Sequence, residues 1–171
     1  MFHIVLVEPE IPYNTGNVAR LCVGLGATLH LVGKLGFSTA DRYLKRAGLD
    51  YWEHVQVRYH QDLPALAAQN ANGRWLYTTS HGRRLYTDWH FARDDFLVFG
   101  KETAGLPAEL LAQYPDQVVR IPQWGPVRSL NLSNAVAVVA YEGARQLLAR
   151  GDLTVPEPPE PELPAGWQPK Q

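Results

Sequence analysis

The stretch VRSLNLSNAVAVVAYE, residues 127–142, decides the fold class because it joins a polar segment to an almost wholly apolar helix. Residues 135–140 read Ala-Val-Ala-Val-Val-Ala, so the helix expected over 131–149 has little surface suited to water. Hydrogen-bonding side chains gather at its start: Arg128, Ser129, Asn131, Ser133 and Asn134. A helix cap at Ser129 or Asn131 would not use all five. Side chains and free amides at a helix start suit a polar ligand, so a binding site is expected there.

Short β-branched runs alternate with helical patterns along the rest of the chain. Strands are expected over 3–8, 29–33, 55–59, 75–80, 96–100 and 118–122, and further helices over 16–25, 39–47, 62–70 and 107–113. Strand runs that are apolar on both faces are typical of a parallel sheet covered on both sides. The predicted fold class is therefore α/β, with a mostly parallel sheet and helices on both faces. The pattern does not give the order of the strands.

The composition predicts one domain over residues 1–153, followed by a proline-rich extended tail over 154–171. The net charge of −1 argues against wholesale coating of nucleic acid. A single cysteine, Cys22, allows no internal disulfide, and the six histidines lack the spacing of metal ligands, so no metal is expected. No signal peptide and no apolar run of about 20 residues are visible, so a cytoplasmic protein without a membrane partner is expected.

The segment NTGNVAR, residues 14–20, opens one expected helix. Asn14 or Thr15 can cap that helix, and Gly16 allows a ligand or another chain to approach the backbone. A cap does not account for Arg20, which stands one turn further on among apolar residues. A cation on a largely buried helix needs an anionic partner, so Arg20 is a candidate functional residue.

The segment FGKETAGLP, residues 99–107, places two glycines around a charged turn directly after a buried strand. In open α/β sheets, ligands bind beyond the carboxyl ends of the strands, so this loop is a candidate wall of a pocket. It is not a phosphate-binding P-loop, because Asp95 stands where the earlier glycine should be and Glu102 replaces the serine or threonine. The dinucleotide-binding G-x-G-x-x-G and the hydrolase G-x-S-x-G motifs are also missing from the sequence.

Three motifs together resemble those of the SPOUT class of RNA methyltransferases, and within it the TrmH-like branch of ribose 2′-O-methyltransferases. They read N-T-G-N-x-x-R at 14–20, F-G-x-E-x-x-G-L-P at 99–107 and I-P-x-x-x-x-x-R-S-L-N-L-S-N-A-V at 121–136, in the usual order and spacing. The resemblance covers residues 1 to about 150. The short chain, with IVLVEPEIPYNTGN near its start and KRAGLDYWEH following, resembles the subgroup that methylates the wobble nucleotide of tRNA, position 34.

This resemblance implies an α/β fold with a deep trefoil knot near the C-terminus, a feature that periodicity alone does not predict. It also implies that S-adenosylmethionine is the cofactor and S-adenosylhomocysteine the product. The residues carried over as cofactor-binding are Tyr77, Thr78, Gly100, Glu102, Ile121, Ser129 and Leu130. The resemblance further implies a homodimer joined through the C-terminal helix and the first helix, in which each site is completed by the partner.

The same resemblance assigns the catalytic roles to Arg20, Ser129 and Asn131. A guanidinium keeps its proton up to a pKa of about 12 or higher, so Arg20 is expected to hold a phosphate and stabilise developing alkoxide charge rather than act as a base. Ser129 and Asn131 would orient the ribose.

Contact with tRNA needs local positive charge. Arg42, Lys45 and Arg46 fall on one face of the helix expected over 39–47, and Arg83 and Arg84 follow the strand expected over 75–80. A solvated surface is the alternative interpretation of these charges. Three aromatic residues could stack on an extruded base, although aromatic side chains are more often part of a core: Tyr51, Trp52 and Trp124.

Two other functions remain open at this point. A methyltransferase of the same fold could act on a different RNA, such as ribosomal RNA, although the chain has no added RNA-binding domain. A non-catalytic RNA-binding module of the same fold is the second alternative. The presence of Arg20, Glu102, Ser129 and Asn131 argues against it.

Overall fold

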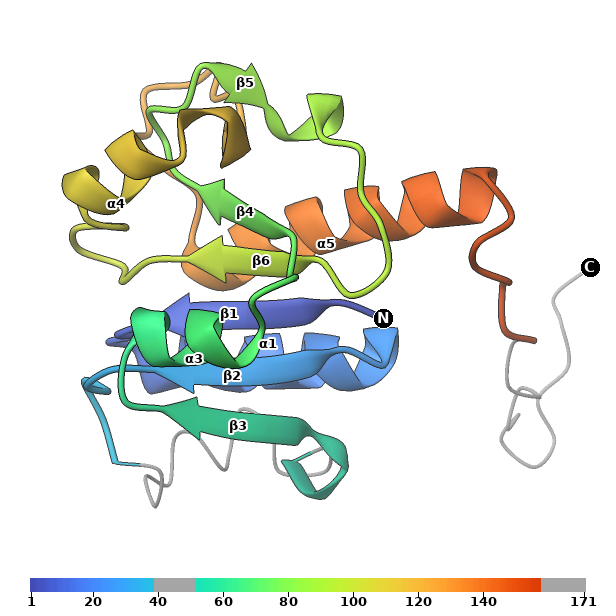
Figure 1. The fold of residues 1–171 in the computed structure, drawn as a ribbon, viewed down its shortest axis with the longest axis horizontal. Helices are drawn as coiled ribbons and strands as arrows, with labels where there is room; N and C mark the ends of the chain where they lie inside the picture. Colours follow the sequence, from blue (N-terminus) through green and yellow to red (C-terminus); the bar gives the residue numbers. More distant parts are fainter. Residues whose placement is uncertain (39–51, 158–171) are drawn as a thin grey trace, which may run out of the picture.

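In the computed structural model, which describes residues 1–38 and 52–157, seven parallel strands form one sheet (Figure 1). In sheet order they are β3 (Gln56–His60), β2 (Thr28–Val32), β1 (His3–Val7), β6 (Phe96–Phe99), β4 (Trp75–Thr78), β7 (Val118–Arg120) and β5 (Arg84–Leu85). The strand order reverses between β1 and β6, and open sheets bind ligands beside such a reversal.

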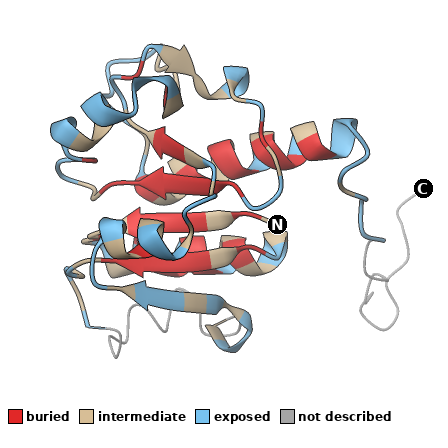
Figure 2. Cartoon of the chain, viewed as in Figure 1, coloured by how far each residue is buried: buried red, intermediate tan, exposed pale blue. Residues whose placement is uncertain are grey.

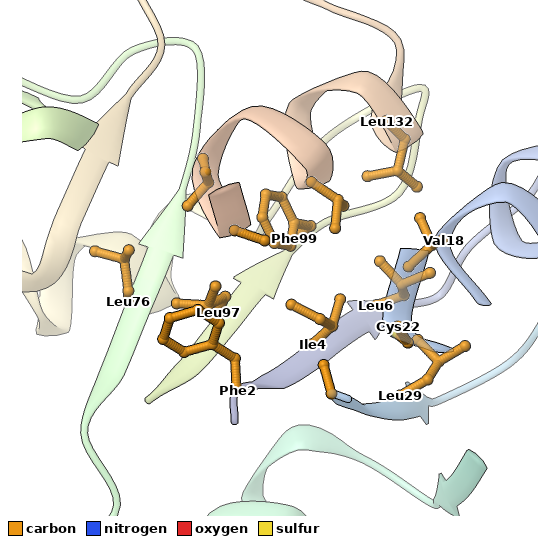
Figure 3. Close-up of a cluster of buried hydrophobic side chains, with 14 of the residues drawn as sticks. Phe2, Ile4, Leu6, Val18, Cys22, Leu29, Leu76, Leu97, Phe99 and Leu132 are labelled. Carbon is orange, nitrogen blue, oxygen red and sulfur yellow. The ribbon is translucent and has the colours of Figure 1, made fainter. Parts of the chain in front are cut away.

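One face of the sheet is covered by two long helices, α1 (Pro12–Leu25) and α5 (Leu132–Ala149). Side chains from β1, β6 and both helices form a single buried cluster, in which Ile4, Leu97 and Val139 are fully buried. Figure 3 shows Val18 and Cys22 of α1 on one side of this cluster and Leu132 of α5 above Phe99. The packing fixes both helices against the middle of the sheet.

The opposite face carries the shorter helices α3 (Leu63–Gln69) and α4 (Ala108–Gln113). Alternate strand residues, such as Val5 and Val98, point to this side and pack with Leu66 of α3 in a second cluster. Central strands β1, β2 and β6 are largely buried, whereas edge strand β3 is more exposed (Figure 2). The α/β class, the mostly parallel sheet and the helices on both faces are thus confirmed.

The six expected strands and four of the five expected helices are present, with small shifts at their ends. The short strand β5 and three 3-10 turns, η1 (Trp52–His54), η2 (Tyr86–Asp88) and η3 (Pro115–Gln117), were not predicted. The helix expected over 39–47 lies outside the described residues, as does most of the tail. The trefoil knot and the division between domain and tail stay predictions.

The expected cap of the first helix is wrong. α1 begins at Pro12 with Ile11 as its N-cap, so Asn14 and Thr15 lie inside the first turn and are buried. The expected cap of the last helix is confirmed, because Oδ1 of Asn131 accepts the Ser133 N–H at 3.0 Å.

The two long helices are less uniformly buried than their composition suggests. Val136 and Val139 of α5 pack inside the chain, while Tyr141 is 55% exposed. On α1, Tyr13, Asn17 and Arg20 lie on an exposed stripe. The chain itself therefore covers each helix except along one stripe. No helix in residues 1–38 and 52–157 combines the length and apolar character needed to span a membrane.

Three histidines form a hydrogen-bonded chain across β1, β2 and β3. Nδ1 of His3 lies 2.9 Å from Nε2 of His30, and Nδ1 of His30 lies 2.9 Å from Nε2 of His60. His30 is 1% exposed, and its burial, together with nearby His3, His60 and Arg58, lowers its pKa to about 3. Burial also lowers the pKa values of His3 and His60.

Acid is therefore expected to destabilise the fold from about pH 6.5 downward. The unfolded chain binds a proton at position 30 near the ordinary histidine pKa of about 6.5, and the folded chain binds it only near 3. His30 thus contributes stability that is full above about pH 6.5 and declines by up to about 1.4 kcal/mol per pH unit below it. Urea unfolding at pH 7 and pH 5 measures the effect. The pH dependence should shrink in His30→Phe. It should persist in His90→Ala, because His90 is exposed and is not one of the three hydrogen-bonded histidines. Equal wild-type stability at both pH values would contradict the assignment.

Candidate functional site

A cleft of about 1100 Å³ lies beyond the carboxyl ends of β4, β6 and β7. Its walls come from the segments after these three strands, 78–81, 99–108 and 121–132, and from the start of α1. The volume is close to the upper end of the usual range for small-molecule sites, about 300–1,000 Å³. The position matches the expected pocket at the start of the last helix.

Two glycines give the loop after β6 its shape. A Cβ on Gly100 would lie 2.1 Å from the carbonyl carbon of Gly105 and 2.3 Å from the Leu106 nitrogen, so only glycine fits there. Gly105 has a φ of +69°, in the left-handed region that favours glycine, and its N–H donates to the Lys101 carbonyl at 2.9 Å. The loop folds back on itself directly beside the cleft. The two glycines thus have a structural role that the sequence argument had attributed mainly to ligand binding.

The charged residues of this loop bind the segment between β1 and α1. Lys101 pairs with Glu8 at 3.0 Å, and this pairing raises the Lys101 pKa. Thr103 donates its N–H and its hydroxyl to the Glu10 carboxylate, each at 3.0 Å. The two loops that flank the reversal of strand order are thereby held together.

Glu102 provides the third connection, with three hydrogen bonds. Its carboxylate accepts the N–H groups of Glu10 at 2.8 Å and Ile11 at 3.2 Å, and the Asn14 side-chain amide at 2.8 Å. Such contacts satisfy free amides at the start of α1, a place where negative charge is stabilised by the helix dipole. The capping group that sequence analysis sought in Asn14 or Thr15 is therefore Glu102, about 90 residues away in the chain.

The contacts continue to α5. Nδ2 of Asn131 donates to Oδ1 of Asn14 at 2.9 Å, and Oδ1 of Asn131 also accepts the Ser133 hydroxyl at 2.7 Å. Glu102, Asn14 and Asn131 thus form one hydrogen-bonded chain that joins the three sequence motifs. Each side chain orients the next, which fixes the start of α5 relative to the cleft.

Six of the seven residues expected to bind a cofactor line this cleft: Thr78, Gly100, Glu102, Ile121, Ser129 and Leu130. Tyr77 does not. Its ring is 4% exposed and stacks on Tyr114 at 5.3 Å, and burial raises its pKa to about 12. Only the backbone of Tyr77 remains as a possible contribution to a ligand site. Asn131, expected to be catalytic, also lines the cleft.

Arg20 lies elsewhere. It is exposed on α1 and is not among the residues that line the cleft of its own chain. The buried position that sequence analysis assumed for Arg20 is therefore wrong, because the stripe of α1 that carries it faces outward. Its catalytic role stays a prediction that requires another chain or the bound substrate to approach this stripe.

The two arginines after β4 differ in their surroundings. Arg84 donates to the carbonyls of Asp116, at 3.3 Å, and Asp88, and its guanidinium lies 5.3 Å from the Trp89 ring centre. These contacts hold Arg84 within the fold, whereas Arg83 is exposed. The expected RNA contact thus has more support at Arg83 than at Arg84. Arg42, Lys45 and Arg46 lie outside the described residues.

Several cleft residues were missed by sequence analysis as site residues. Thr79, Ser80 and His81 continue the wall after β4, and Gln123 belongs to the wall before α5. Arg128 also lines the cleft, as expected from its place among the polar side chains at the start of the last helix. The available signal was their position directly after expected strands, because all such loops meet at one edge of a parallel sheet. In residues 1–38 and 52–157, no three histidine, cysteine or acidic side chains are grouped as metal ligands.

Known proteins resemble this chain both in sequence and in fold. Residues 1–141 match the SpoU rRNA Methylase family. The tRNA (cytidine(34)-2′-O)-methyltransferase of Acidovorax sp. (strain JS42) is 50% identical over 164 residues, covering 94% of this chain and 99% of the relative.

Solved structures show the same relationship. A structure described as "Structural insights into the 2-OH methylation of C/U34 on tRNA" superposes with a TM-score of 0.84 at 47% identity, covering 88% of this chain and 98% of that one. The SpoU methyltransferase AviRb from Streptomyces viridochromogenes, in complex with AdoMet, superposes with a TM-score of 0.75 at 26% identity, covering 86% of this chain and 60% of that one. The chain belongs to the SpoU rRNA Methylase family, which confirms the resemblance to SPOUT methyltransferases.

Proposed function

We propose that this protein transfers a methyl group from S-adenosylmethionine to the ribose 2′-hydroxyl of nucleotide 34, the wobble nucleotide of tRNA. The observation that carries the proposal is the hydrogen-bonded chain Glu102–Asn14–Asn131, which joins the three motifs at one cleft. Relatives about half identical over most of their length bear the name of this activity. The wobble base would be cytidine or uridine, the two that the description of the related structure names.

The cleft has features that suit the cofactor. Thr78 lines the cleft, and its hydroxyl is covered by neighbouring atoms and makes no hydrogen bond within the described residues. A polar ligand group would reach this hydroxyl only after the side chain rotates toward the cleft. The tight turn at Gly100 forms part of the cleft wall, and Ile121 and Leu130 would supply apolar contact for an adenine ring. S-adenosylmethionine, when bound, supplies a methyl group on a positively charged sulfur.

The residues of the chain would act by orientation and by electrostatic stabilisation. Ser129 and Asn131, at the start of α5, would hold the ribose so that its 2′-oxygen faces the methyl carbon. Arg20 would bind the adjacent phosphate and stabilise negative charge that develops on the 2′-oxygen. Because Arg20 does not line the cleft of its own chain, we assign this role to the Arg20 of a second subunit.

A homodimer would bring the two together. The exposed stripe of α1, with Tyr13 and Arg20, and the exposed stripe of α5, with Tyr141, belong to two helices that pack against each other. We propose that these stripes form the subunit contact, together with the partly buried Val138 of α5. RNA would then be held by Arg128 at the cleft, by Arg83 in the loop after β4, and by the cationic side chains Arg42, Lys45 and Arg46.

Methylation of ribosomal RNA is the second candidate, favoured by the description of the matched family. The named activity of the relatives that align over nearly their full length favours tRNA instead. The same named activity of these relatives argues against a non-catalytic module.

The proposal is tested with the purified chain, S-adenosylmethionine and an unmodified tRNA. Calorimetric titration should give close to one cofactor site per chain. At 100 times the dissociation constant, the cofactor should add about 2.7 kcal/mol of stability. Labelled methyl should then appear at the ribose of nucleotide 34, and a tRNA with a 2′-deoxyribose at that position should accept none. Cofactor binding with transfer only to ribosomal RNA would support the second candidate, and binding without transfer to either RNA would support the third.

A further inference from the structure

Trp124 is exposed to an unusual degree. Its side chain is 91% exposed, whereas Trp52, Trp75 and Trp89 are each partly buried. Trp52 packs against the main core, and the Trp89 indole donates to Asp95 at 3.0 Å. Burial of an indole is among the largest favourable contributions that one side chain makes to the free energy of folding or binding. A tryptophan left exposed by the fold is therefore a candidate contact for a binding partner.

The place of Trp124 in the chain indicates where that partner binds. Ile121 and Gln123 before it, and Arg128 and Ser129 after it, line the cleft. Trp124 itself is absent from the cleft lining, so its ring lies outside the part of the loop that forms the wall. A ligand that extends out of the cleft past this loop would meet the indole.

The chemistry of the neighbouring side chains identifies the kind of partner. Arg128 is an exposed cation in the cleft lining, and Gln123 and Ser129 add hydrogen-bonding groups. Besides Trp124, only Val127, 57% exposed, is a large exposed apolar side chain within residues 121–131. Two such residues make a small patch compared with the several hundred Å² typical of protein-binding sites. An aromatic face beside a cation and polar groups suits a nucleobase and its phosphate.

We propose that Trp124 is a stacking platform for a base of the RNA substrate, either that of the methylated nucleotide or one directly next to it. This inference rests on the proposed function. It adds a residue that holds the nucleotide by its base while Ser129 and Asn131 hold the ribose. Of the three aromatic residues that the sequence offered for stacking, Trp52 packs against the core and Tyr51 lies outside the described residues.

The first test measures binding of a tRNA anticodon stem-loop to the full-length protein loaded with S-adenosylhomocysteine. Trp124→Ala should raise the dissociation constant by about 5- to 150-fold, the range found when a base-stacking aromatic is removed. Trp124→Phe should retain most of the affinity, because a phenyl ring still offers a flat face. Tyr59→Ala is the matched control, since Tyr59 is 56% exposed on edge strand β3 outside the cleft lining, and its loss should change affinity less than twofold.

The second test removes the base instead of the tryptophan. Stem-loops that carry an abasic ribose at position 34, or at one of its two neighbours, are titrated against wild type and Trp124→Ala. If Trp124 stacks on one of these bases, loss of that base weakens wild-type binding, and Trp124→Ala then adds no further loss. Additive losses at all three positions would overturn the proposal, because they would mean that indole and base act independently.

A role for Trp124 between subunits or within the fold gives a different result. In that case, Trp124→Ala would dissociate the protein in sedimentation or weaken cofactor binding in calorimetry, and either outcome would overturn the proposal. Failure of the proposed function is recognised separately, because wild type would then transfer no methyl to tRNA. Normal transfer by wild type with unchanged RNA affinity in Trp124→Ala would overturn the stacking role alone.

Discussion

Replacing Gly100 by alanine is expected to abolish cofactor binding and to lower the stability of the whole fold. The new methyl group would lie 2.1 Å from the Gly105 carbonyl carbon and 2.4 Å from its oxygen, and these are backbone atoms that no rotamer change can move. Phe99, just before it, is 2% exposed in the core, so β6 cannot shift easily either. The loop over 100–106 must therefore open.

Opening this loop would have consequences beyond the cleft. Lys101, Glu102 and Thr103 hold the start of α1, and their movement would leave the Glu10 and Ile11 amides and the Asn14 side chain without these acceptors. Overpacking alone typically costs about 1–3 kcal/mol, and a buried group left without a partner costs about 1–3 kcal/mol more. Gly100→Ala should thus show a clearly lower denaturation midpoint and no heat on cofactor titration.

Gly125→Ala is the matched control for this substitution. Gly125 lies in another loop of the cleft wall, and a Cβ there would meet no atom within 4 Å. Its replacement should leave both stability and cofactor affinity near wild type. Normal cofactor affinity in Gly100→Ala would show that the loop tolerates the methyl group and that its shape does not govern the site.

Local rules predicted the elements well and the long-range contacts poorly. The cap of α5 was predictable because Asn131 and the amide that it binds are two residues apart. The cap of α1 was not predictable, because Glu102 lies in the loop after β6 and the sequence near position 12 contains no signal of that contact. Sequence analysis therefore assigned a cofactor role to a side chain whose carboxylate is engaged by the fold.

For the candidate site too, the sequence predicted some features and not others. That the motif loops meet at one edge was predictable from parallel strands, whose carboxyl ends share that edge. Side-chain direction was not, as Tyr77 and Thr78 show: adjacent strand residues point to opposite faces, so Thr78 enters the cleft while Tyr77 packs against Tyr114. Two-residue β5 was missed because its pairing with β7 depends on the fold as a whole.

Arg20→Ala is expected to reduce methyl transfer by about 100-fold or more while cofactor affinity stays near wild type. That factor corresponds to about 3 kcal/mol, the usual loss when one preorganised stabiliser of developing charge is removed. Single-turnover transfer of a labelled methyl group, with calorimetry on the same variant, separates the two effects. Arg20→Lys should recover little, because an ammonium group cannot reproduce the planar two-point contact of a guanidinium with phosphate. Activity within threefold of wild type would remove Arg20 from the mechanism and leave Ser129 and Asn131 as the candidates.

The position of Arg20 makes a stronger test possible. If the Arg20 of one subunit serves the cleft of the other, mixing two inactive variants should restore activity. Arg20→Ala has an intact cleft, and Ser129→Trp, which places a bulky ring at an exposed lining position, keeps Arg20 but should bind no cofactor. A mixed dimer then contains one complete site, made from the cleft of the first chain and the Arg20 of the second.

Sedimentation of wild type at micromolar concentration should show the dimer on which this complementation test depends. If Arg20 acted within its own chain, neither subunit of the mixed dimer would hold both parts, and no activity would return. Loss of folding in Arg20→Ala would instead mean that the contacts of this side chain are structural.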